Sequence, residues 1–382
     1  MKIGIPREVL EGETRVAVVP SMIAVLKKSN HDVFIETGAG LRASFADREY
    51  QDAGAVISPD CRELYQASNV VLKFQPPRLH PQAGAHEADL LAAGTALICF
   101  MEPHLYPEVI RQLAARKITG FAMDYVPRIT RAQTMDALSS ISTIIGYKAV
   151  LVAAYHLGKL FPLLMTAAGT IPPANVMILG AGVAGLQAIA TARRLGAKVE
   201  AFDPRPAVKE QVKSLGAQFI DMEITENVET AGGYAKEQSE AFLLKERDAI
   251  AARLPKMDAV ITTAQVFGKR APLLMTEAMV KLMRPGSVIV DLAADQGGNC
   301  ELSEPNKTVV KHGVTLIGVV NLANTLPVHA SQMYSKNITN LFLHLYKAPD
   351  GALDFTDEIT KGACLTHQGE IVNASVKKII SG

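Results

Sequence analysis

The chain has 382 residues, with 48% hydrophobic and 20% charged side chains and a formal net charge of +1 at pH 7. This length exceeds one ordinary hydrophobic core and predicts two domains of roughly 150–200 residues each. The composition excludes a disordered polymer, and the near-zero charge without a dense basic stripe argues against a nucleic-acid partner.

The four cysteines, Cys61, Cys99, Cys300 and Cys364, lie far apart and form no CxxC pair. Their spacing favours a reducing compartment over a disulfide framework or a zinc ribbon, and we expect no metal site. The N-terminus MKIGIPREVLEG lacks the apolar core of a signal peptide. The longest apolar runs are too short for a membrane span or are interrupted, for example by Lys148, so we expect a soluble chain.

The first 135 or so residues alternate short apolar runs with amphipathic helical patterns, which predicts an α/β unit with a parallel sheet. We expect strands at residues 2–6, 32–38, 69–74, 95–100 and 118–124, with helices at 20–30 and 106–117. The apolar segment 138–158 predicts a buried connecting helix. Segment 161–174 contains a glycine and three prolines, which predicts an interdomain loop.

A second α/β unit begins at Asn175. We expect its strands at residues 175–180, 198–203, 258–264, 287–293 and 314–319, and its helices at 182–196 and 276–286. The long helical pattern at 331–347 is expected to pack back on the first unit. The predicted fold is therefore α/β with two parallel-sheet domains, the first at 1–137 completed by 325–382 and the second at 138–324.

The segment Gly180-Ala181-Gly182-Val183-Ala184-Gly185 is a GxGxxG between a predicted strand and a predicted helix. That context is the one the dinucleotide-binding fingerprint requires. Gly180 allows a tight turn, Gly182 lets a pyrophosphate approach the backbone, and Gly185 permits close packing of helix on strand. The free N–H groups of the helix start then face the phosphates.

The next predicted strand ends at Asp203, followed by Pro204 and Arg205. A carboxylate at this position accepts hydrogen bonds from ribose hydroxyls and repels a 2′-phosphate, which favours NAD(H) over NADP(H). The neighbouring Arg205 leaves NADP(H) as the alternative, because an arginine there pairs with a 2′-phosphate.

Three long blocks in this order resemble the alanine dehydrogenase/transhydrogenase family: GIPREVLEGETRVAVVP, AAGTIPPANVMILGAGVAGLQAIATARRLGA and MRPGSVIVDLAADQGGNCE. The family includes alanine dehydrogenase and the NAD(H)-binding alpha subunit of proton-translocating NAD(P)+ transhydrogenase. The resemblance implies two Rossmann-like domains separated by a cleft.

The positions of two proton-transfer groups favour the transhydrogenase branch. Gln75 stands where the resemblance places the alanine dehydrogenase lysine, and Glu102 stands where it places the histidine. Lys73 and His104 each lie two residues away, on the same strand face, so they remain alternatives. Transfer of a hydride between two nicotinamides needs alignment and no acid–base pair.

The loop PRITRAQTMDALSS resembles the Arg-Gln-Asp loop of the transhydrogenase component, with Arg128, Gln133 and Asp136 as its expected catalytic residues. TAGGYAKEQ resembles the mobile loop of that component. By position, the implied cofactor-binding set is Arg128, Ile129, Thr130, Gln133, Asp136, Ser139, Gly180, Ala181, Gly182, Val183, Gly185, Asp203, Pro204, Arg205, Gly233, Tyr234, Ala264 and Gln265. Arg15 and Asp295 match alanine dehydrogenase site residues, and we expect Arg15 to form a structural ion pair.

The resemblance implies hydride transfer from NADH to NADP+ held by a partner subunit, with a membrane subunit translocating protons. It also implies a homodimer at the cytoplasmic face of a membrane, bound there through its partners. The alternatives are an NAD-dependent alanine or related amino-acid dehydrogenase and a non-catalytic NADH-responsive regulatory protein.

Overall fold

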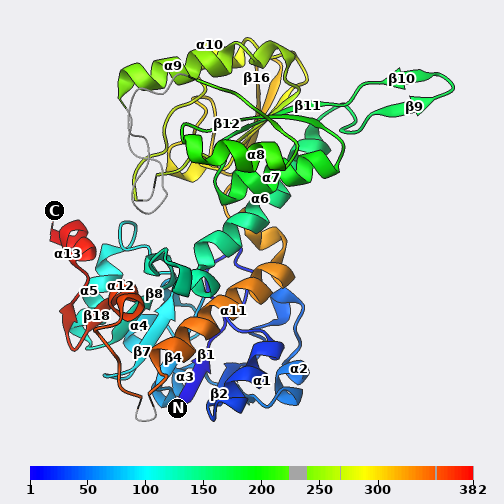
Figure 1. Cartoon of the computed structure of the whole chain (residues 1–382). Helices are drawn as coiled ribbons and strands as arrows, with labels where there is room; N and C mark the ends of the chain where they lie inside the picture. The colour runs from blue at the N-terminus through cyan, green and yellow to red at the C-terminus, as the bar shows by residue number, and fades with distance from the viewer. Residues whose placement is uncertain (223–238, 267, 349–350, 382) are drawn as a thin grey trace. The chain divides into compact units, whose positions relative to one another are not determined.

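The computed structural model describes residues 1–222, 239–266, 268–348 and 351–381. The chain divides into two compact units, with unit 1 formed by 1–141 and 323–382 and unit 2 by 142–322. We expected the boundaries at 137/138 and 324/325. Figure 1 shows each unit as a sheet flanked by helices.

Unit 1 is built on an eight-stranded sheet in the order β19-β18-β8-β7-β4-β1-β2-β3. Its strands are β1 (Lys2–Ile5), β2 (Asp32–Glu36), β3 (Val56–Ser58), β4 (Val70–Leu72), β7 (Ala96–Cys99), β8 (Thr119–Ala122), β18 (Cys364–His367) and β19 (Glu370–Ile371). Six neighbouring strands are parallel, namely β3, β2, β1, β4, β7 and β8. β18 and β19 extend the sheet in antiparallel pairs. In chain order the parallel strands follow the sequence 3-2-1-4-5-6, which is the Rossmann order.

The helices of unit 1 cover both faces of this sheet, because successive strand residues enter two different cores. Val70 and Leu72 lie in one apolar cluster and Val71 in another, so β4 is buried on both sides. The helices are α1 (Pro20–Lys28), α2 (Asp47–Asp52), α3 (Cys61–Ala67), α4 (Glu87–Leu90), α5 (Pro107–Ala115), α11 (Pro327–Leu345), α12 (Glu358–Ala363) and α13 (Ala374–Ser381). A small hairpin joins β5 (Leu79–His80) to β6 (Ala85–His86).

The long helix α11 packs into the core of unit 1, as its apolar pattern predicted. Tyr334, Ile338, Leu341 and Phe342 are fully buried in the same cluster as the strand residues of β1 and β2. The C-terminal segment of the chain therefore completes the first unit rather than forming a third one.

Unit 2 is a seven-stranded sheet in the order β13-β12-β11-β14-β15-β17-β16. Its strands are β11 (Asn175–Leu179), β12 (Lys198–Phe202), β13 (Gln218–Phe219), β14 (Ala259–Thr262), β15 (Val288–Asp291), β16 (Lys307–Lys311) and β17 (Val314–Gly318). Its helices are α7 (Val183–Arg194), α8 (Lys209–Ser214), α9 (Glu240–Ala251) and α10 (Glu277–Val280). Again the parallel strands follow the 3-2-1-4-5-6 order, and β16 pairs antiparallel at the edge. The predicted α/β fold class is confirmed for both units.

Helix α6 (Ala137–His156) runs from unit 1 into unit 2 and is less buried than we predicted. Within the described residues it is the one helix long and apolar enough to cross a membrane, and a third of its most apolar window is buried. Ala137 lies in a core of unit 1, and Ala149, Val150 and Ala153 lie in a core of unit 2. Tyr155 near its end is 85% exposed.

The predicted interdomain loop at 161–174 is instead a β-hairpin of β9 (Leu164–Thr166) and β10 (Gly169–Ile171) in unit 2. Figure 1 shows it projecting from the rest of that unit. The glycine sits at the turn, with φ of +129°, so it reverses the chain within a hairpin instead of opening a loop.

One glycine decides how closely α6 and α7 approach within unit 2. A Cβ added to Gly146 would lie 2.1 Å from the carbonyl oxygen of Ala184. This neighbour is helix backbone and cannot move aside, so the overlap outweighs the gain in helix propensity that alanine normally brings.

We predict that Gly146→Ala lowers the free energy of unfolding by about 1–3 kcal/mol, measured by urea denaturation. Gly158→Ala is the matched control, because a Cβ there meets no atom of the described residues within 4 Å. Equal stability of the two variants would contradict the close approach of the helices.

Candidate functional site

The glycine loop of unit 2 connects β11 to α7 in the way the fingerprint predicts. Gly180 follows the strand with φ of +97°, and Gly182 is the N-cap residue of α7. A Cβ on Gly185 would lie 1.8 Å from the carbonyl oxygen of Gly180, so a side chain there is excluded. Because α7 begins at Val183, its unpaired N–H groups lie directly after the loop.

The loops that follow β12 and β14 lie beside this glycine loop, since these strands flank β11 in parallel. Asp203 therefore lies at the same sheet edge as Gly180, and so does Ala264. The hydroxyl of Thr263 donates to the carbonyl of Gly180 at 3.1 Å and fastens two of these loops together. Unit 2 thus brings the predicted residues 180–185, 203–205 and 264–265 to one edge of its sheet.

Asn299, which the sequence did not single out, fixes the backbone at Ala264. Its amide accepts from the Ala264 N–H at 3.1 Å and donates to the Ala264 carbonyl at 2.8 Å, and its side chain is fully buried. The Gln265 side chain donates to the carbonyl of Leu292 at 3.0 Å. The only sequence signal was the position of Asn299 in the third block, GGNCE.

Asp203 is buried, and its carboxylate forms an ion pair with Arg205 at 2.8 Å. The same carboxylate accepts the N–H of Ala181 at 2.7 Å, which ties the end of β12 to the glycine loop. Glu246 is buried on α9, and the negative charge of Asp203 acts on its carboxyl group. Burial, with the charge of Asp203 adding to it, raises the pKa of Glu246 to about 8.

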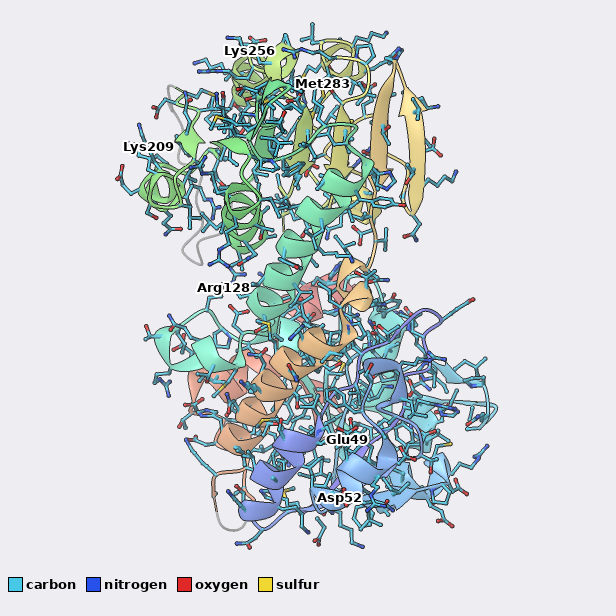
Figure 2. The ribbon with its side chains drawn as sticks, turned by 90° about the vertical axis from the view of Figure 1, so that its right-hand side faces the viewer. Glu49, Asp52, Arg128, Lys209, Lys256 and Met283 are labelled. Atoms are coloured by element: carbon cyan, nitrogen blue, oxygen red, sulfur yellow. The ribbon has the colours of Figure 1, made fainter. Side chains whose placement is uncertain are left out.

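In unit 1, the loop that begins with Arg128 leads into a short 3-10 helix, Thr130–Met135, which carries Gln133. Its Ala132 and Met135 are buried in the core, whereas Arg128 and Gln133 are exposed. Figure 2 labels Arg128. The loop therefore has an apolar underside, against which the partly buried Ile129 also packs, and a polar outer side that includes the exposed Thr130.

The backbone of this loop is held from beneath by α11. The Thr134 carbonyl accepts from the Asn337 amide at 2.9 Å and from the Asn340 amide at 3.2 Å. Arg131 pairs with Asp357 at 3.1 Å, the N-cap residue of α12. These contacts fix the loop that presents Gln133.

Asp136 caps the N-terminus of α6, a role that we did not predict. Its carboxylate accepts from the Ser139 N–H at 2.9 Å and from the Ser139 hydroxyl at 2.6 Å. Both oxygens are therefore engaged by Ser139, one of the predicted cofactor-binding residues. Any contact of Asp136 with a ligand has to share these oxygens.

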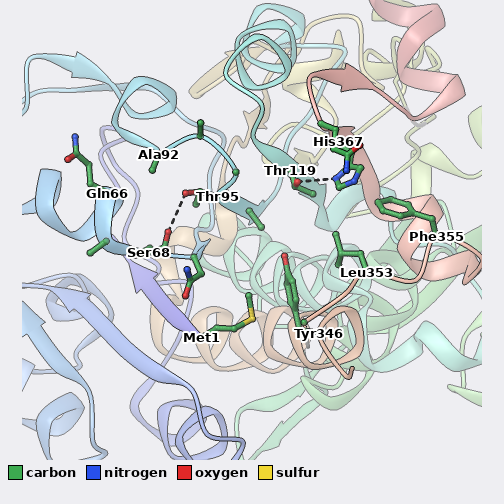
Figure 3. Close-up of a pocket in the computed structure, with 17 residues that line it drawn as sticks. Met1, Gln66, Ser68, Ala92, Thr95, Thr119, Tyr346, Leu353, Phe355 and His367 are labelled. Carbon is green, nitrogen blue, oxygen red and sulfur yellow. Dashed lines mark hydrogen bonds between the residues drawn. The ribbon is translucent and has the colours of Figure 1, made fainter. Parts of the chain in front are cut away.

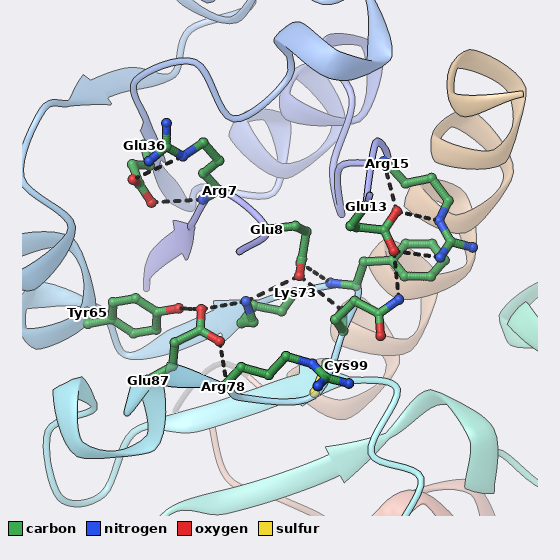
Figure 4. Close-up of polar contacts among 12 residues, drawn as sticks. Arg7, Glu8, Glu13, Arg15, Glu36, Tyr65, Lys73, Arg78, Glu87 and Cys99 are labelled. Carbon is green, nitrogen blue, oxygen red and sulfur yellow. Dashed lines mark hydrogen bonds and ion pairs between the residues drawn. The ribbon is translucent and has the colours of Figure 1, made fainter. Parts of the chain in front are cut away.

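Lys73 is fully buried, and its ammonium is held by two carboxylates (Figure 4). Its Nζ lies 2.6 Å from Glu87 Oε1 and 3.3 Å from Glu8 Oε2. Burial alone would lower the pKa of Lys73, but the two carboxylates outweigh it and raise that pKa. Burial also raises the pKa of Glu8 to about 7, against the opposing charge of Lys73. Lys73 is thus a charged structural group with no exposed surface.

Gln75 belongs to a second polar cluster in unit 1, built on Glu13. The Gln75 amide donates to Glu13 at 2.6 Å, and Arg15 pairs with the same carboxylate at 2.6 Å. The Arg15 guanidinium lies 3.8 Å from the centre of the Phe74 ring. The predicted structural ion pair of Arg15 is therefore present, and its charge is balanced within the cluster.

Glu102 follows β7 with φ of +42°, a left-handed conformation uncommon for a residue with a side chain. Its N–H donates to Asp124 at 3.0 Å, and this buried carboxylate also accepts the Met101 N–H at 2.9 Å.

Burial lowers the pKa of His104, which favours its neutral form. In unit 2, burial raises the pKa of Asp295.

A cavity of about 910 Å³ lies at the edge of the unit 1 sheet where the parallel strands begin, opposite the edge at which they end (Figure 3). It is lined at the amino ends of the strands, by Met1, Asn69 and Thr119 among others. The predicted site residues that the structure describes are not among those lining it. Gly233 and Tyr234, which we predicted in a mobile loop, lie outside the described residues.

Comparison with known proteins covers both units. Residues 4–145 match the family described as alanine dehydrogenase/PNT, N-terminal domain, and residues 149–374 match alanine dehydrogenase/PNT, C-terminal domain. The chain belongs to the alanine dehydrogenase/PNT family. This confirms the resemblance seen in the three sequence blocks.

Within the alanine dehydrogenase/PNT family, the chain is 46% identical over 380 residues to an NAD(P) transhydrogenase subunit alpha protein of Rhodospirillum rubrum, covering 98% of this chain and 99% of that protein. The solved transhydrogenase of Sinorhizobium meliloti has 41% identity and a TM-score of 0.86, over 97% of this chain and 100% of that one. An L-alanine dehydrogenase structure has 29% identity and a TM-score of 0.82, over 100% and 99%.

We predict that Glu246→Gln removes a pH-dependent loss of stability. The native state holds a proton on Glu246 up to about pH 8, whereas an unfolded chain releases it near pH 4.5. Stability from this group is full below the lower value and is lost as pH rises to the upper one. The difference amounts to the order of a few kcal/mol.

The free energy of unfolding of both proteins, measured from pH 5 to pH 8.5, tests this. The variant should gain stability relative to the wild type as pH rises. Parallel pH profiles would show that Glu246 is not protonated in the native state.

Proposed function

We propose that this chain is the NAD(H)-binding component of a proton-translocating NAD(P)+ transhydrogenase, in which a hydride passes from NADH to NADP+ held by a partner subunit. The observation that carries the proposal is the burial of Lys73 between Glu8 and Glu87. An amino-acid dehydrogenase needs a group that exchanges protons with its substrate. Lys73 is sealed from solvent and paired with two carboxylates, which argues against that role for it.

The residues of unit 2 suit a dinucleotide. Gly182 and Gly185 leave the backbone of the glycine loop open to a pyrophosphate, and Asp203 lies where the adenosine ribose is bound in such folds. NAD(H), when bound, supplies or accepts the hydride at C4 of the nicotinamide. The similarity to transhydrogenase alpha subunits supports the choice of this cofactor.

The residues of unit 1 suit alignment. We propose that Arg128, Gln133, Asp136 and Ser139 surround the nicotinamide, its ribose and the pyrophosphate, and that Gln133 reaches toward the second nucleotide. Gln133 is exposed on a loop whose backbone is held in place by Asn337 and Asn340. Its side chain therefore extends from a fixed position. Orientation of two rings with water excluded is the main requirement of the reaction.

We also propose a homodimer that binds an NADP(H)-binding subunit and a proton-translocating membrane subunit at the cytoplasmic face. The relatives named as a subunit alpha support an assembly of several chains. The β9–β10 hairpin supports a further contact, because Met165 is 74% exposed and Leu163 and Ile171 are also exposed. A second copy of the chain is the proposed cover.

The decisive assay presents the purified chain with two sets of reactants. In the first it receives NADH and the NADP+-loaded partner subunit, and in the second NADH, pyruvate and ammonia. We predict rapid formation of NADPH in the first mixture and no alanine in the second. Alanine formation would establish an amino-acid dehydrogenase, and tight NADH binding with neither product would establish a binding or regulatory protein.

We predict that Gln133→Ala slows single-turnover hydride transfer by roughly tenfold to a hundredfold, because the rings lose an aligning contact. Since Gln133 is exposed, the fold should be unaffected, and NADH affinity should change far less than the rate. Thr134→Ala is the matched control, because the loop is anchored through the Thr134 carbonyl and not its side chain. A parallel loss of affinity and rate would reduce Gln133 to a binding contact.

A further inference from the structure

The 3-10 helix that carries Gln133 has three distinct faces, because side chains three positions apart lie above one another in such a helix. Ala132 and Met135 share the face that is buried in the core of unit 1. Thr130 and Gln133 share a second face, and both are exposed. Arg131 lies on the third face, so it can hold the loop without obstructing Gln133.

Arg131 is held by the carboxylate of Asp357, the N-cap residue of α12. Arg131 Nη1 donates to Asp357 Oδ2 at 3.1 Å. The other oxygen, Oδ1, accepts the N–H groups of Ile359 and Thr360 at 2.9 and 3.2 Å, and His344 Nε2 lies 2.9 Å from it. The two oxygens therefore have separate roles, since Oδ1 caps α12 and Oδ2 holds the loop.

The same face of α11 supports both Asp357 and the loop. Asn337, Asn340 and His344 follow one another at spacings of three and four residues, which places them on one side of the helix. Asn337 and Asn340 donate to the Thr134 carbonyl, and His344 contacts Asp357, whose side chain is only 8% exposed. The loop is thus held directly by α11 and, through Asp357, by α11 and α12 together.

Stability of the fold does not account for this pair. The Arg131 side chain is 60% exposed, and ion pairs at exposed positions contribute little to the free energy of unfolding. Capping of α12 requires only Oδ1 of Asp357. Position is a different matter, because displacing an aligning group by about 1 Å can slow a reaction by about a hundredfold.

We propose that Asp357 is a positioning residue for hydride transfer and acts through Arg131 on the loop that presents Gln133. Asp357 sets the place of the backbone from which Gln133 extends, and it makes no contact with the nucleotide. Asp357 lies 226 positions after Arg131, so the C-terminal segment takes part in aligning the reactants. This inference rests on the proposed role of Gln133 in orienting the two nicotinamides.

Asp357→Asn isolates the contact, because asparagine caps a helix as well as aspartate does. Its amide oxygen can replace Oδ1, whereas its NH2 group in place of Oδ2 cannot accept from Arg131. Arg131→Gln removes the ion pair from the other side, and the double variant shows whether both residues act through one contact. Asp89→Asn is the matched control, because it removes an Asp–Arg pair, with Arg116, elsewhere in unit 1.

Each full-length variant is compared with the wild type in single-turnover hydride transfer from NADH to NADP+ on the partner subunit, in NADH affinity, and in amide hydrogen exchange of residues 130–136. We expect Asp357→Asn, Arg131→Gln and the double variant each to slow transfer by roughly tenfold, with a change in NADH affinity of about twofold or less. Amide exchange in the loop should become faster in all three. Asp89→Asn should match the wild type.

Transfer at the wild-type rate in folded Asp357→Asn would overturn the inference. Losses that add in the double variant would also overturn it, because Arg131 would then act independently of Asp357. The same holds if NADH affinity falls as much as the rate. A wild type that transfers no hydride would overturn the proposed function and the role of Asp357 with it, and this result is recognised without any variant.

Discussion

The parallel order of the strands is the constraint on which both candidate sites depend. In each unit the strands run 3-2-1-4-5-6, so their carboxyl ends meet at one edge and their loops become neighbours. In unit 2 this places the glycine loop between Asp203 and Ala264. In unit 1 it places Lys73 after β4 and Glu102 after β7, on adjacent parallel strands.

At these strand ends the two units treat charge differently. In unit 1 the charged groups form ion pairs with one another: Lys73 pairs with Glu8 and Glu87, and Arg15 pairs with Glu13. A buried ammonium is stable only with such partners, and removing one carboxylate would leave an uncompensated charge. In unit 2 Asp203 pairs with Arg205 and also accepts the Ala181 N–H of the glycine loop. In the proposed function, unit 2 binds the dinucleotide and unit 1 orients the nicotinamide.

Local patterns were sufficient to predict the elements that carry the nucleotide site. The apolar run before Gly180, the glycine spacing and the amphipathic pattern of α7 are all encoded within about twenty residues, and the structure has each of them. The return of α11 to unit 1 was also predictable, because its apolar face is long enough to require a core. The hairpin at 164–171 was not, because it is short and its residues face solvent on both sides.

Features that depend on partners far apart in the chain could not be predicted from the sequence. Asn299 meets Ala264 and Asn337 meets Thr134 across 35 and 203 positions of the chain. The pKa of Glu246 depends on burial and on the charge of Asp203, which is distant in the sequence. The antiparallel strands β18 and β19 depend on the pairing of β18 with β8. Asp136 is instructive in another way, since its position before an apolar helix was a capping signal as well as a functional one.

We propose that this chain aligns two nicotinamides and transfers no proton. Single-turnover transfer from NADH deuterated at the transferring C4 position, with NADP+ on the partner subunit, tests it across pH 6 to 9. We predict that all the label reaches NADPH, at a rate that does not follow the ionisation of any single group. Loss of label to water, or a rate that rises and falls with one titrating side chain, would contradict it.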